Sequence, residues 1–173
     1  MEAEPARSKH PSWVQILVVG RNPRRTLLRA LVTVSLALVI FRLVLIPIRV
    51  DGISMLPTYH TKQFNLVNRL AYLFHEPRRG DVVSVITSGK SIMYMKRVVG
   101  VPGETIAFAN GRLVINGIAT PEPYLTYPSD WNLPPRKLGP REYFLVGDNR
   151  TMPPELHTHG VVDGRRILGK VLL

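Results

Sequence analysis

The segment Leu27 to Ile48 constrains this chain more than any other feature, because it is 22 residues long and almost entirely apolar. As an α-helix it would be about 33 Å long, enough to cross the hydrocarbon layer of a bilayer. Its two charged residues, Arg29 and Arg42, lie towards opposite ends, where a long side chain extends to the headgroups. The segment therefore predicts a transmembrane anchor over residues 27–48.

Two other interpretations of this segment remain open. Its uninterrupted part, Ala30 to Phe41, has twelve residues, which is the length of a signal-peptide core. No small-x-small cleavage site follows in Leu43 to Arg49, and this favours an anchor that is retained. The second alternative is a helix buried in the core of a soluble protein.

The distribution of charge indicates an orientation for the anchor. The chain has a net charge of +11, and residues 1–49 hold eight Lys/Arg against two Asp/Glu. Arg21, Arg24, Arg25 and Arg29 flank the N-terminal side, so residues 1–26 are predicted to be cytoplasmic and residues 49–173 to lie on the outer face. Because the basic residues adjoin an apolar segment, we expect a lipid bilayer as a partner and no nucleic acid.

After the anchor the pattern changes to short strand-like runs separated by Gly, Pro and Asn. The predicted strands are Phe64–Val67, Val82–Ile86, Ile92–Val99, Thr105–Ala109, Leu113–Ile115 and Tyr143–Val146. Asn110-Gly111 and Asn116-Gly117 are typical of tight hairpin turns. Pro121 to Pro140, with six prolines, is predicted to be a long loop or an excursion rather than a core element. The predicted fold is mainly β, an antiparallel domain of residues 49–173 behind one N-terminal transmembrane helix.

The chain has no cysteine, so thiolate chemistry, disulfides and Cys-ligated metals are excluded. Ser54 follows the anchor directly, and a serine hydroxyl needs a base to become a nucleophile. The five histidines stand without an orienting acid at a recognisable spacing, although a triad gathered by folding stays open. His157 and His159 alone make a poor metal site, and no metal is expected.

Lys96 is the alternative base, because it lies in an apolar strand-like run. The two-residue period of a strand places it on one face with Tyr94 and Val98. Burial there would lower its pKa from about 10.4 toward 7 or 8, and the neutral amine is then able to accept a proton. The competing interpretation is a lysine at a sheet edge whose ammonium group reaches solvent.

Four motifs occur in one order after the apolar segment. They are Ser54-Met55-Leu56-Pro57-Thr58, then Arg78 to Val83, then Tyr94 to Glu104, then Gly147-Asp148-Asn149-Arg150. In this arrangement, over roughly residues 27–173, the chain resembles the bacterial type I signal peptidases.

The resemblance implies a membrane-anchored serine endopeptidase with a signal-peptidase-like β-rich catalytic domain. Such an enzyme removes N-terminal signal peptides from exported proteins by a Ser-Lys dyad, without a cofactor. It implies a single-pass protein of the bacterial cytoplasmic membrane and preproteins with small residues first and third before the cut. The sequence does not indicate an oligomeric state.

The resemblance also assigns roles to residues of this chain. Ser54 matches the nucleophile and Lys96 the general base. Four residues are expected to support the oxyanion and the active site: Gly52, Asp148, Asn149 and Arg150. Four apolar residues are candidate walls of the substrate pocket: Val50, Met55, Tyr94 and Met95.

Two departures from the family pattern leave other functions open. Gly52 replaces a serine that assists the oxyanion in some members, and Pro153, Glu155 and His157 replace a Ser-x-Asp-x-Arg pattern. Thr151 or Thr158 is then the expected source of the hydroxyl beside Lys96. The alternatives are a specialised relative that matures one exported substrate such as a pilin, and an inactive membrane-anchored peptide-binding module.

Overall fold

The computed structural model describes residues 22–86, 93–154 and 160–172. The chain divides into two compact units, Met1–Arg42 and Leu43–Leu173. In the described residues the first unit consists of a helix, and the second is a β domain.

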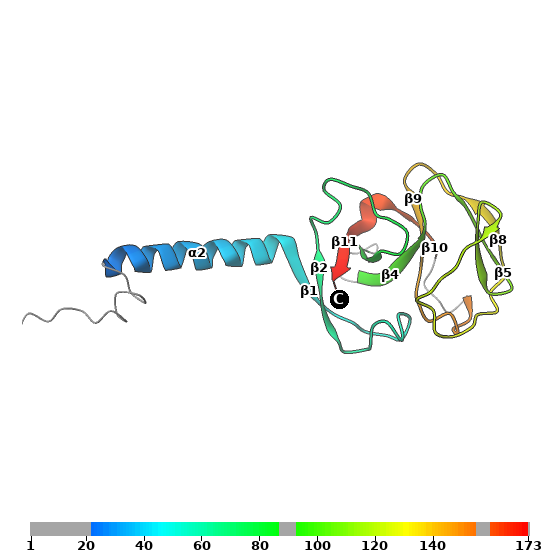
Figure 1. The fold of residues 1–173 in the computed structure, drawn as a ribbon, viewed down its shortest axis with the longest axis horizontal. Helices are drawn as coiled ribbons and strands as arrows, with labels where there is room; N and C mark the ends of the chain where they lie inside the picture. Colours follow the sequence, from blue (N-terminus) through cyan, green and yellow to red (C-terminus); the bar gives the residue numbers. More distant parts are fainter. Residues whose placement is uncertain (1–21, 87–92, 155–159, 173) are drawn as a thin grey trace, which may run out of the picture. The chain divides into compact units, whose positions relative to one another are not determined.

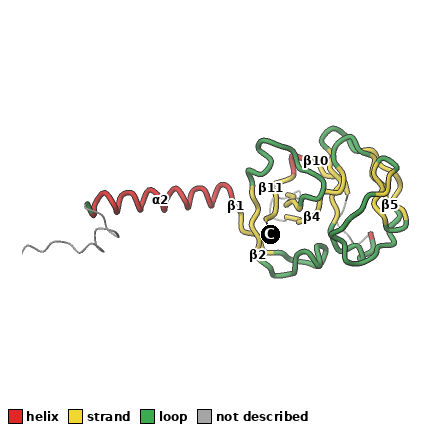
Figure 2. Tube along the Cα trace, viewed as in Figure 1, coloured by secondary structure: helices red, strands yellow, loops and turns green. Residues whose placement is uncertain are grey.

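Helix α2 (Pro23–Val44) is the red helix labelled in Figure 2. It has 22 residues, and none of them is buried. Within the described residues it is the one helix that is long and apolar enough to cross a membrane. The Thr26 N–H donates to the Asn22 carbonyl (3.1 Å), so Asn22 caps the helix and Pro23 takes the first helical position. Proline is well suited to this position, because its fixed φ is helical and because an N–H at the first helical position would have no partner within the helix.

The helix begins and ends four residues earlier than the predicted span of Leu27 to Ile48. Pro47 explains its end, because proline within a helix removes a hydrogen bond and clashes with the preceding turn. Residues Leu45–Arg49 instead form strand β1, which pairs with β2 at the edge of a sheet. Proline is tolerated at such an edge.

The β domain contains two antiparallel sheets. The strands after β1 are β2 (Phe64–Asn68), β3 (Val82–Ile86), β4 (Met93–Gly100), β5 (Thr105–Ala109), β6 (Arg112–Ile115), β7 (Ile118–Ala119), β8 (Leu133–Lys137), β9 (Glu142–Val146), β10 (Gly160–Asp163) and β11 (Ile167–Leu172). Seven form a sheet in the order β1-β2-β11-β3-β4-β9-β10, and four form a second sheet in the order β7-β6-β5-β8. Figure 1 shows β5 and β8 on one side of this domain and β1, β2 and β11 on the other.

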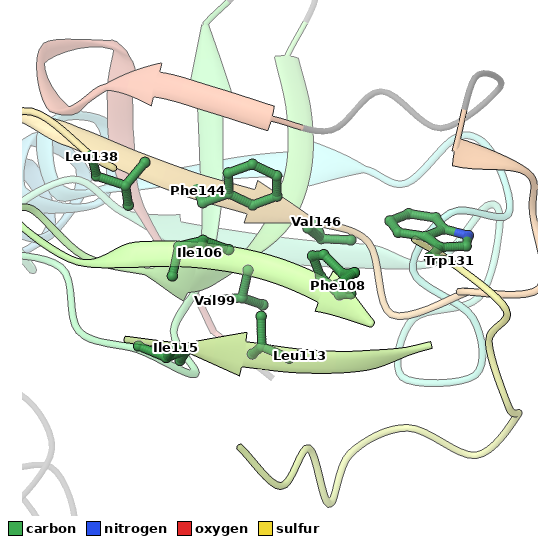
Figure 3. Close-up of a cluster of buried hydrophobic side chains, with 9 residues drawn as sticks. All are labelled: Val99, Ile106, Phe108, Leu113, Ile115, Trp131, Leu138, Phe144 and Val146. Carbon is green, nitrogen blue, oxygen red and sulfur yellow. The ribbon is translucent and has the colours of Figure 1, made fainter. Parts of the chain in front are cut away.

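The largest apolar cluster joins the two sheets (Figure 3). Ile106 and Phe108 from β5 and Leu113 and Ile115 from β6 meet Val99 from β4 and Phe144 and Val146 from β9, with Trp131 and Leu138 alongside. A second cluster, made of Met55, Tyr59, Val67, Val82 and Val171, lies on the larger sheet. This second cluster carries the loop of the candidate nucleophile.

The prediction of a mainly β, antiparallel domain behind an apolar N-terminal helix is confirmed. All six predicted strands have counterparts, with Ile92 outside the described residues. Asn110 and Gly111 have φ values of 48° and 75°, as a type I′ hairpin turn requires. Of the two alternatives for Pro121 to Pro140, an unbroken loop is wrong for Leu133–Lys137, because β8 is a largely exposed edge strand that accommodates Pro134 and Pro135.

Candidate active site

Ser54 lies in the loop between β1 and β2, which is closed by backbone hydrogen bonds at Val50. The Val50 N–H donates to the Gln63 carbonyl (2.9 Å), and the Lys62 N–H donates to the Val50 carbonyl (2.8 Å). Met55 and Tyr59 are almost fully buried in the cluster on the larger sheet. Met55, the residue after Ser54, is therefore held in the core, while Ser54 itself stays half-buried.

Gly52 stands two residues before Ser54 with a φ of +103°. Side chains other than hydrogen are strained in this conformation. A Cβ there would meet no atom within 4 Å, so the constraint comes from the backbone and not from crowding. The local geometry thus accounts for the glycine at this position.

Lys96 comes from β4, opposite Val83 of β3, and its Nζ lies 2.6 Å from the Ser54 Oγ. The residue is 4% exposed. Burial lowers the pKa of the Lys96 ammonium from 10.5 to about 8, although the negative charge of Asp148 favours the protonated form. About half of this amine is therefore neutral at mildly alkaline pH, near 8, and the neutral form is the one that a general base needs.

Asp148 follows β9 and is held by two neighbouring segments. The Arg97 guanidinium donates to both carboxylate oxygens, through Nε (2.8 Å) and Nη2 (2.6 Å). The Thr58 hydroxyl donates to Oδ2 (2.6 Å), which joins the loop of Ser54 to the same carboxylate. Asp148 therefore connects the strand of the base to the loop of the nucleophile.

Asn149 contacts the backbone at Ser54, the candidate nucleophile. Its N–H donates to the Ser54 carbonyl (3.0 Å), and its Nδ2 donates to the Ile53 carbonyl (3.1 Å). The Thr151 hydroxyl donates to the Asn149 Oδ1 (2.7 Å), so it is engaged away from Lys96. These bonds fix the peptide on which Ser54 is mounted.

Arg150 is completely buried and forms an ion pair that the sequence did not suggest. Its guanidinium donates twice to Glu122 (3.0 and 2.5 Å), whose side chain is only 5% exposed. Glu122 also accepts a hydrogen bond from the Tyr124 hydroxyl (2.5 Å). The centre of the Tyr124 ring in turn lies 4.0 Å from the Arg97 guanidinium. Glu122 and Tyr124 together therefore contact both Arg150 and Arg97.

A groove of about 380 Å³ passes the Ser54 and Lys96 side chains. The four candidate pocket residues, Val50, Met55, Tyr94 and Met95, all line it. The groove is also lined by residues that sequence reasoning missed: Pro47, Ile48, Arg49, Asp51, Ser84 and Met93. Among the described histidines, neither His60 nor His75 belongs to this lining, whereas Lys96, the candidate base, does.

The altered final motif lies largely outside the described residues, since Glu155, His157, Thr158 and His159 all fall there. Pro153 is described and has no hydroxyl to offer to Lys96. Within residues 22–86, 93–154 and 160–172, no cluster of three or more His, Cys, Asp or Glu residues is arranged to hold a metal ion.

The sequence comparisons agree with this geometry. The family described as signal peptidase, peptidase S26, matches residues 24–173. The chain belongs to this family. Within the signal peptidases, it is 36% identical over 131 residues to signal peptidase I S of Bacillus subtilis, an alignment that covers 69% of this chain and 70% of that protein.

Two other signal peptidases match the chain over a similar length. A signal peptidase I of Leptolyngbya laminosa is 33% identical over 128 residues, covering 69% of this chain and 63% of the relative. One from Bacillus amyloliquefaciens is 33% identical over 150 residues, covering 80% and 78%. The predictions of the family and of a serine endopeptidase are confirmed by these matches.

Proposed function

We propose that this chain is a membrane-anchored peptidase that removes signal peptides from exported preproteins through a dyad of Ser54 and Lys96. The observation that carries the proposal is the distance of 2.6 Å between Lys96 Nζ and Ser54 Oγ, with the lysine buried. Burial is what makes a lysine a base, because it disfavours the charged ammonium.

In the first half of the reaction, neutral Lys96 accepts the Ser54 hydroxyl proton while Oγ attacks the scissile carbonyl. The ammonium then delivers this proton to the leaving amine as the C–N bond breaks, which leaves an ester on Oγ. In the second half Lys96 takes a proton from water, and the resulting hydroxide attacks the ester. The proton then returns to Oγ as the signal peptide's new carboxylate leaves.

The backbone N–H of Ser54 is the proposed oxyanion donor, with Gly52 leaving space in front of it. No metal or organic cofactor enters this scheme. Asn149 supports it by holding the Ser54 and Ile53 carbonyls, so the peptide that carries the donor is already oriented before substrate binds. Preorganised donors of this kind contribute about 3 to 4 kcal/mol of transition-state stabilisation in other serine peptidases.

The substrate is proposed to enter as an extended chain along β4. Pairing between β4 and β9 begins at Arg97, so Met93 to Lys96 present an edge that β9 does not cover. The groove passes between this edge and residues 49–54. A strand added there gains main-chain hydrogen bonds, while its alternate side chains enter the groove.

Helix α2 is proposed to be the anchor, and its length and uniformly exposed apolar surface support this. The arginines Arg24, Arg25 and Arg29 at its N-terminal end favour a cytoplasmic N-terminus and a catalytic domain outside a bacterial cytoplasmic membrane. A reporter fused after Leu173 that is active only outside the membrane tests this orientation. Activity of the same reporter on the cytoplasmic side would overturn it.

The catalytic proposal is tested with detergent-solubilised protein and a precursor that carries an Ala-x-Ala site. We expect the parent to cleave it and both Ser54→Ala and Lys96→Met to lose cleavage by at least 10³-fold, because both groups take part in the bond-forming step. Lys137→Met, at an exposed lysine of β8, is the matched control and should retain full activity. An active Lys96→Met variant, or a parent that binds precursors without cutting them, would contradict the proposal.

A further inference from the structure

The Arg97 guanidinium forms hydrogen bonds within its own plane and lies against an aromatic ring on its face. Nε and Nη2 donate to Asp148, and Nη1 donates to the Gly80 carbonyl (2.6 Å). All three nitrogens are thus engaged, and the face of the group is left for another kind of contact. The guanidinium carbon lies over the Tyr124 ring, 4.0 Å from its centre, which is within the range of a cation–π interaction.

Tyr124 reaches this position from a segment of the smaller sheet. It lies between β7 and β8, whereas Arg97 belongs to β4 of the larger sheet. A turn closed by the Leu125 N–H and the Glu122 carbonyl (3.1 Å) brings Tyr124 beside Glu122, and the Tyr124 hydroxyl donates to that carboxylate (2.5 Å). Because Glu122 is itself paired with the buried Arg150, the hydroxyl has a fixed partner, and this orients the ring towards Arg97.

The ring affects the charge that acts on Lys96. The Arg97 side chain is 11% exposed and that of Asp148 is completely buried, so a ring on the guanidinium face excludes water from their ion pair. Opposite charges attract each other more strongly where water is excluded. The Asp148 charge favours the ammonium form of Lys96, and Arg97 offsets this charge while the two stay in contact. Losing the ring therefore leaves more negative charge beside Lys96.

The other ionisable groups around this ion pair do not titrate together with Lys96. Within the described part of the chain, Arg97 and Asp148 face three further ionisable side chains: Lys96, Tyr59 and Tyr124. Tyr124 in turn faces Glu122 and Arg150, which are paired with each other. Burial raises the pKa of Tyr59 and of Tyr124, so both phenols stay protonated where Lys96 titrates.

We propose that Tyr124 is a positioning residue for the dyad, whose ring keeps the Arg97 guanidinium on the Asp148 carboxylate and so limits the negative charge that acts on Lys96. The inference rests on the proposed function and adds to it a residue from outside the four sequence motifs. The aromatic face of Tyr124 is the part that acts on Arg97, and the hydroxyl orients it. Phenylalanine keeps this face, whereas leucine removes it.

The test measures the pH dependence of kcat/KM on a precursor with an Ala-x-Ala site. We expect Tyr124→Leu to move the inflection upward by about 0.5–1 pH unit, and thus to lower kcat/KM at pH 7 by about three- to tenfold, because a loosened Arg97 leaves Asp148 less neutralised. Tyr124→Phe should stay at the parent's inflection. Tyr127→Leu is the matched control, since this tyrosine of the same segment is 51% exposed, and it should keep the parent's profile.

A double variant separates this role from a general loosening of the site. Because the ring acts through the Asp148 charge, adding Tyr124→Leu to Asp148→Asn should leave the inflection where Asp148→Asn alone places it. Three results would each overturn the inference while leaving the dyad standing. They are a further shift in the double variant, an unmoved inflection in Tyr124→Leu, and a shift in Tyr124→Phe as large as that in Tyr124→Leu.

An NMR titration of the Lys96 side chain in isotope-labelled protein provides a measurement that does not depend on cleavage. The inflection of its Cε resonance should move upward in Tyr124→Leu and in Tyr124→Met, a second variant without an aromatic face, with thermal unfolding curves showing that both are folded. If the parent cleaved no Ala-x-Ala precursor, the proposed function would fail, and this titration would still test the contact. A resonance that titrates as in the parent would then overturn the inference.

Discussion

Arg97 and Asp148 form a bidentate ion pair, in which two guanidinium nitrogens donate to the two carboxylate oxygens at 2.8 and 2.6 Å. Arg97 is the residue after the candidate base, and Asp148 is the residue before Asn149, which holds the Ser54 carbonyl. The pair therefore connects the strand that carries Lys96 to the segment that holds the Ser54 backbone. Its negative member also influences the protonation of Lys96.

The pH dependence of cleavage follows from the lowered pKa of Lys96. Because only the neutral amine accepts a proton, we expect kcat/KM to fall about tenfold for each pH unit below about 8 and to level off above it. A precursor cleavage assay from pH 5 to 10 measures this. A plateau extending down to pH 6, or an inflection near the ordinary lysine value of 10.5, would rule out Lys96 as the base in this form.

Stability should depend on the same group. The pKa is about 8 in the folded protein and 10.5 in the unfolded chain, so between these pH values the unfolded state binds more protons. The contribution of Lys96 to the free energy of unfolding therefore rises with pH between these two values. Lys96→Met should make the free energy of unfolding depend less on pH in this range. Denaturant unfolding of both proteins at pH 7.5 and pH 10 measures the difference, with Lys137→Met as a control that keeps the parent's slope.

Asp148→Asn should move the inflection of the activity profile to lower pH. The Asp148 charge favours the ammonium form of Lys96, so its removal lowers the pKa of that lysine further. The same substitution at the exposed Asp130 should leave the inflection in place. An inflection of Asp148→Asn that stays at the parent's pH, or shifts to higher pH, would show that the carboxylate does not act on the base in this way.

Glu122→Gln should destabilise the domain by about 3–5 kcal/mol, because it leaves Arg150 charged and unpaired with no exposure to solvent. Glu142→Gln is the matched control, since its pairing with Arg136 is long (3.9 Å) and more exposed, and we expect a cost below about 1 kcal/mol. Urea unfolding of the two variants in one detergent provides the comparison. Equal losses would mean that the buried pair contributes no more than the exposed one.

Gly52→Ser adds a hydroxyl two residues before Ser54, yet we expect it to cost about 1–2 kcal/mol and to bring no gain in kcat. The reason is the φ of +103°, which an L-residue adopts only with strain. Gly139→Ser is the control, because Gly139 has no positive φ and a Cβ there meets nothing closer than 3.4 Å. A Gly52→Ser variant of unchanged Tm and higher kcat would contradict this account.

The sequence predicted strand bounds best where the two-residue alternation of apolar side chains ends at a typical turn sequence. Strand β5 has the predicted bounds, Thr105–Ala109, because alternating apolar residues end at an Asn-Gly pair that only a tight turn accommodates. The helix end was misplaced by its apolar composition, although Pro47 already signals a stop for a helix. Strand β8 escaped prediction because its two prolines resemble a loop unless the strand is known to lie at an edge.

The motif residues of the candidate site were predictable from the sequence. The buried residues that contact them were not. Ser54 and Lys96 were found through the order of four motifs, while their approach depends on a sheet assembled from strands distant in the chain. Glu122 and Tyr124 lie in a proline-rich stretch, where an acidic residue normally faces water. Their burial beside Arg150 and Arg97 results from the packing of the two sheets, which local sequence does not reveal.

Strand β11 lies between β2 and β3 in the larger sheet, and it is the last strand along the described chain. Until residues 167–172 are in place, β2 and β3 have no strand between them to join them. Folding of the sheet is thus deferred until synthesis has passed this point, since its closing contacts are among the most distant in the sequence. A chain that folds in this order brings β2, which follows the loop of Ser54, and β3, which pairs with the strand of Lys96, into one sheet only at its last described strand.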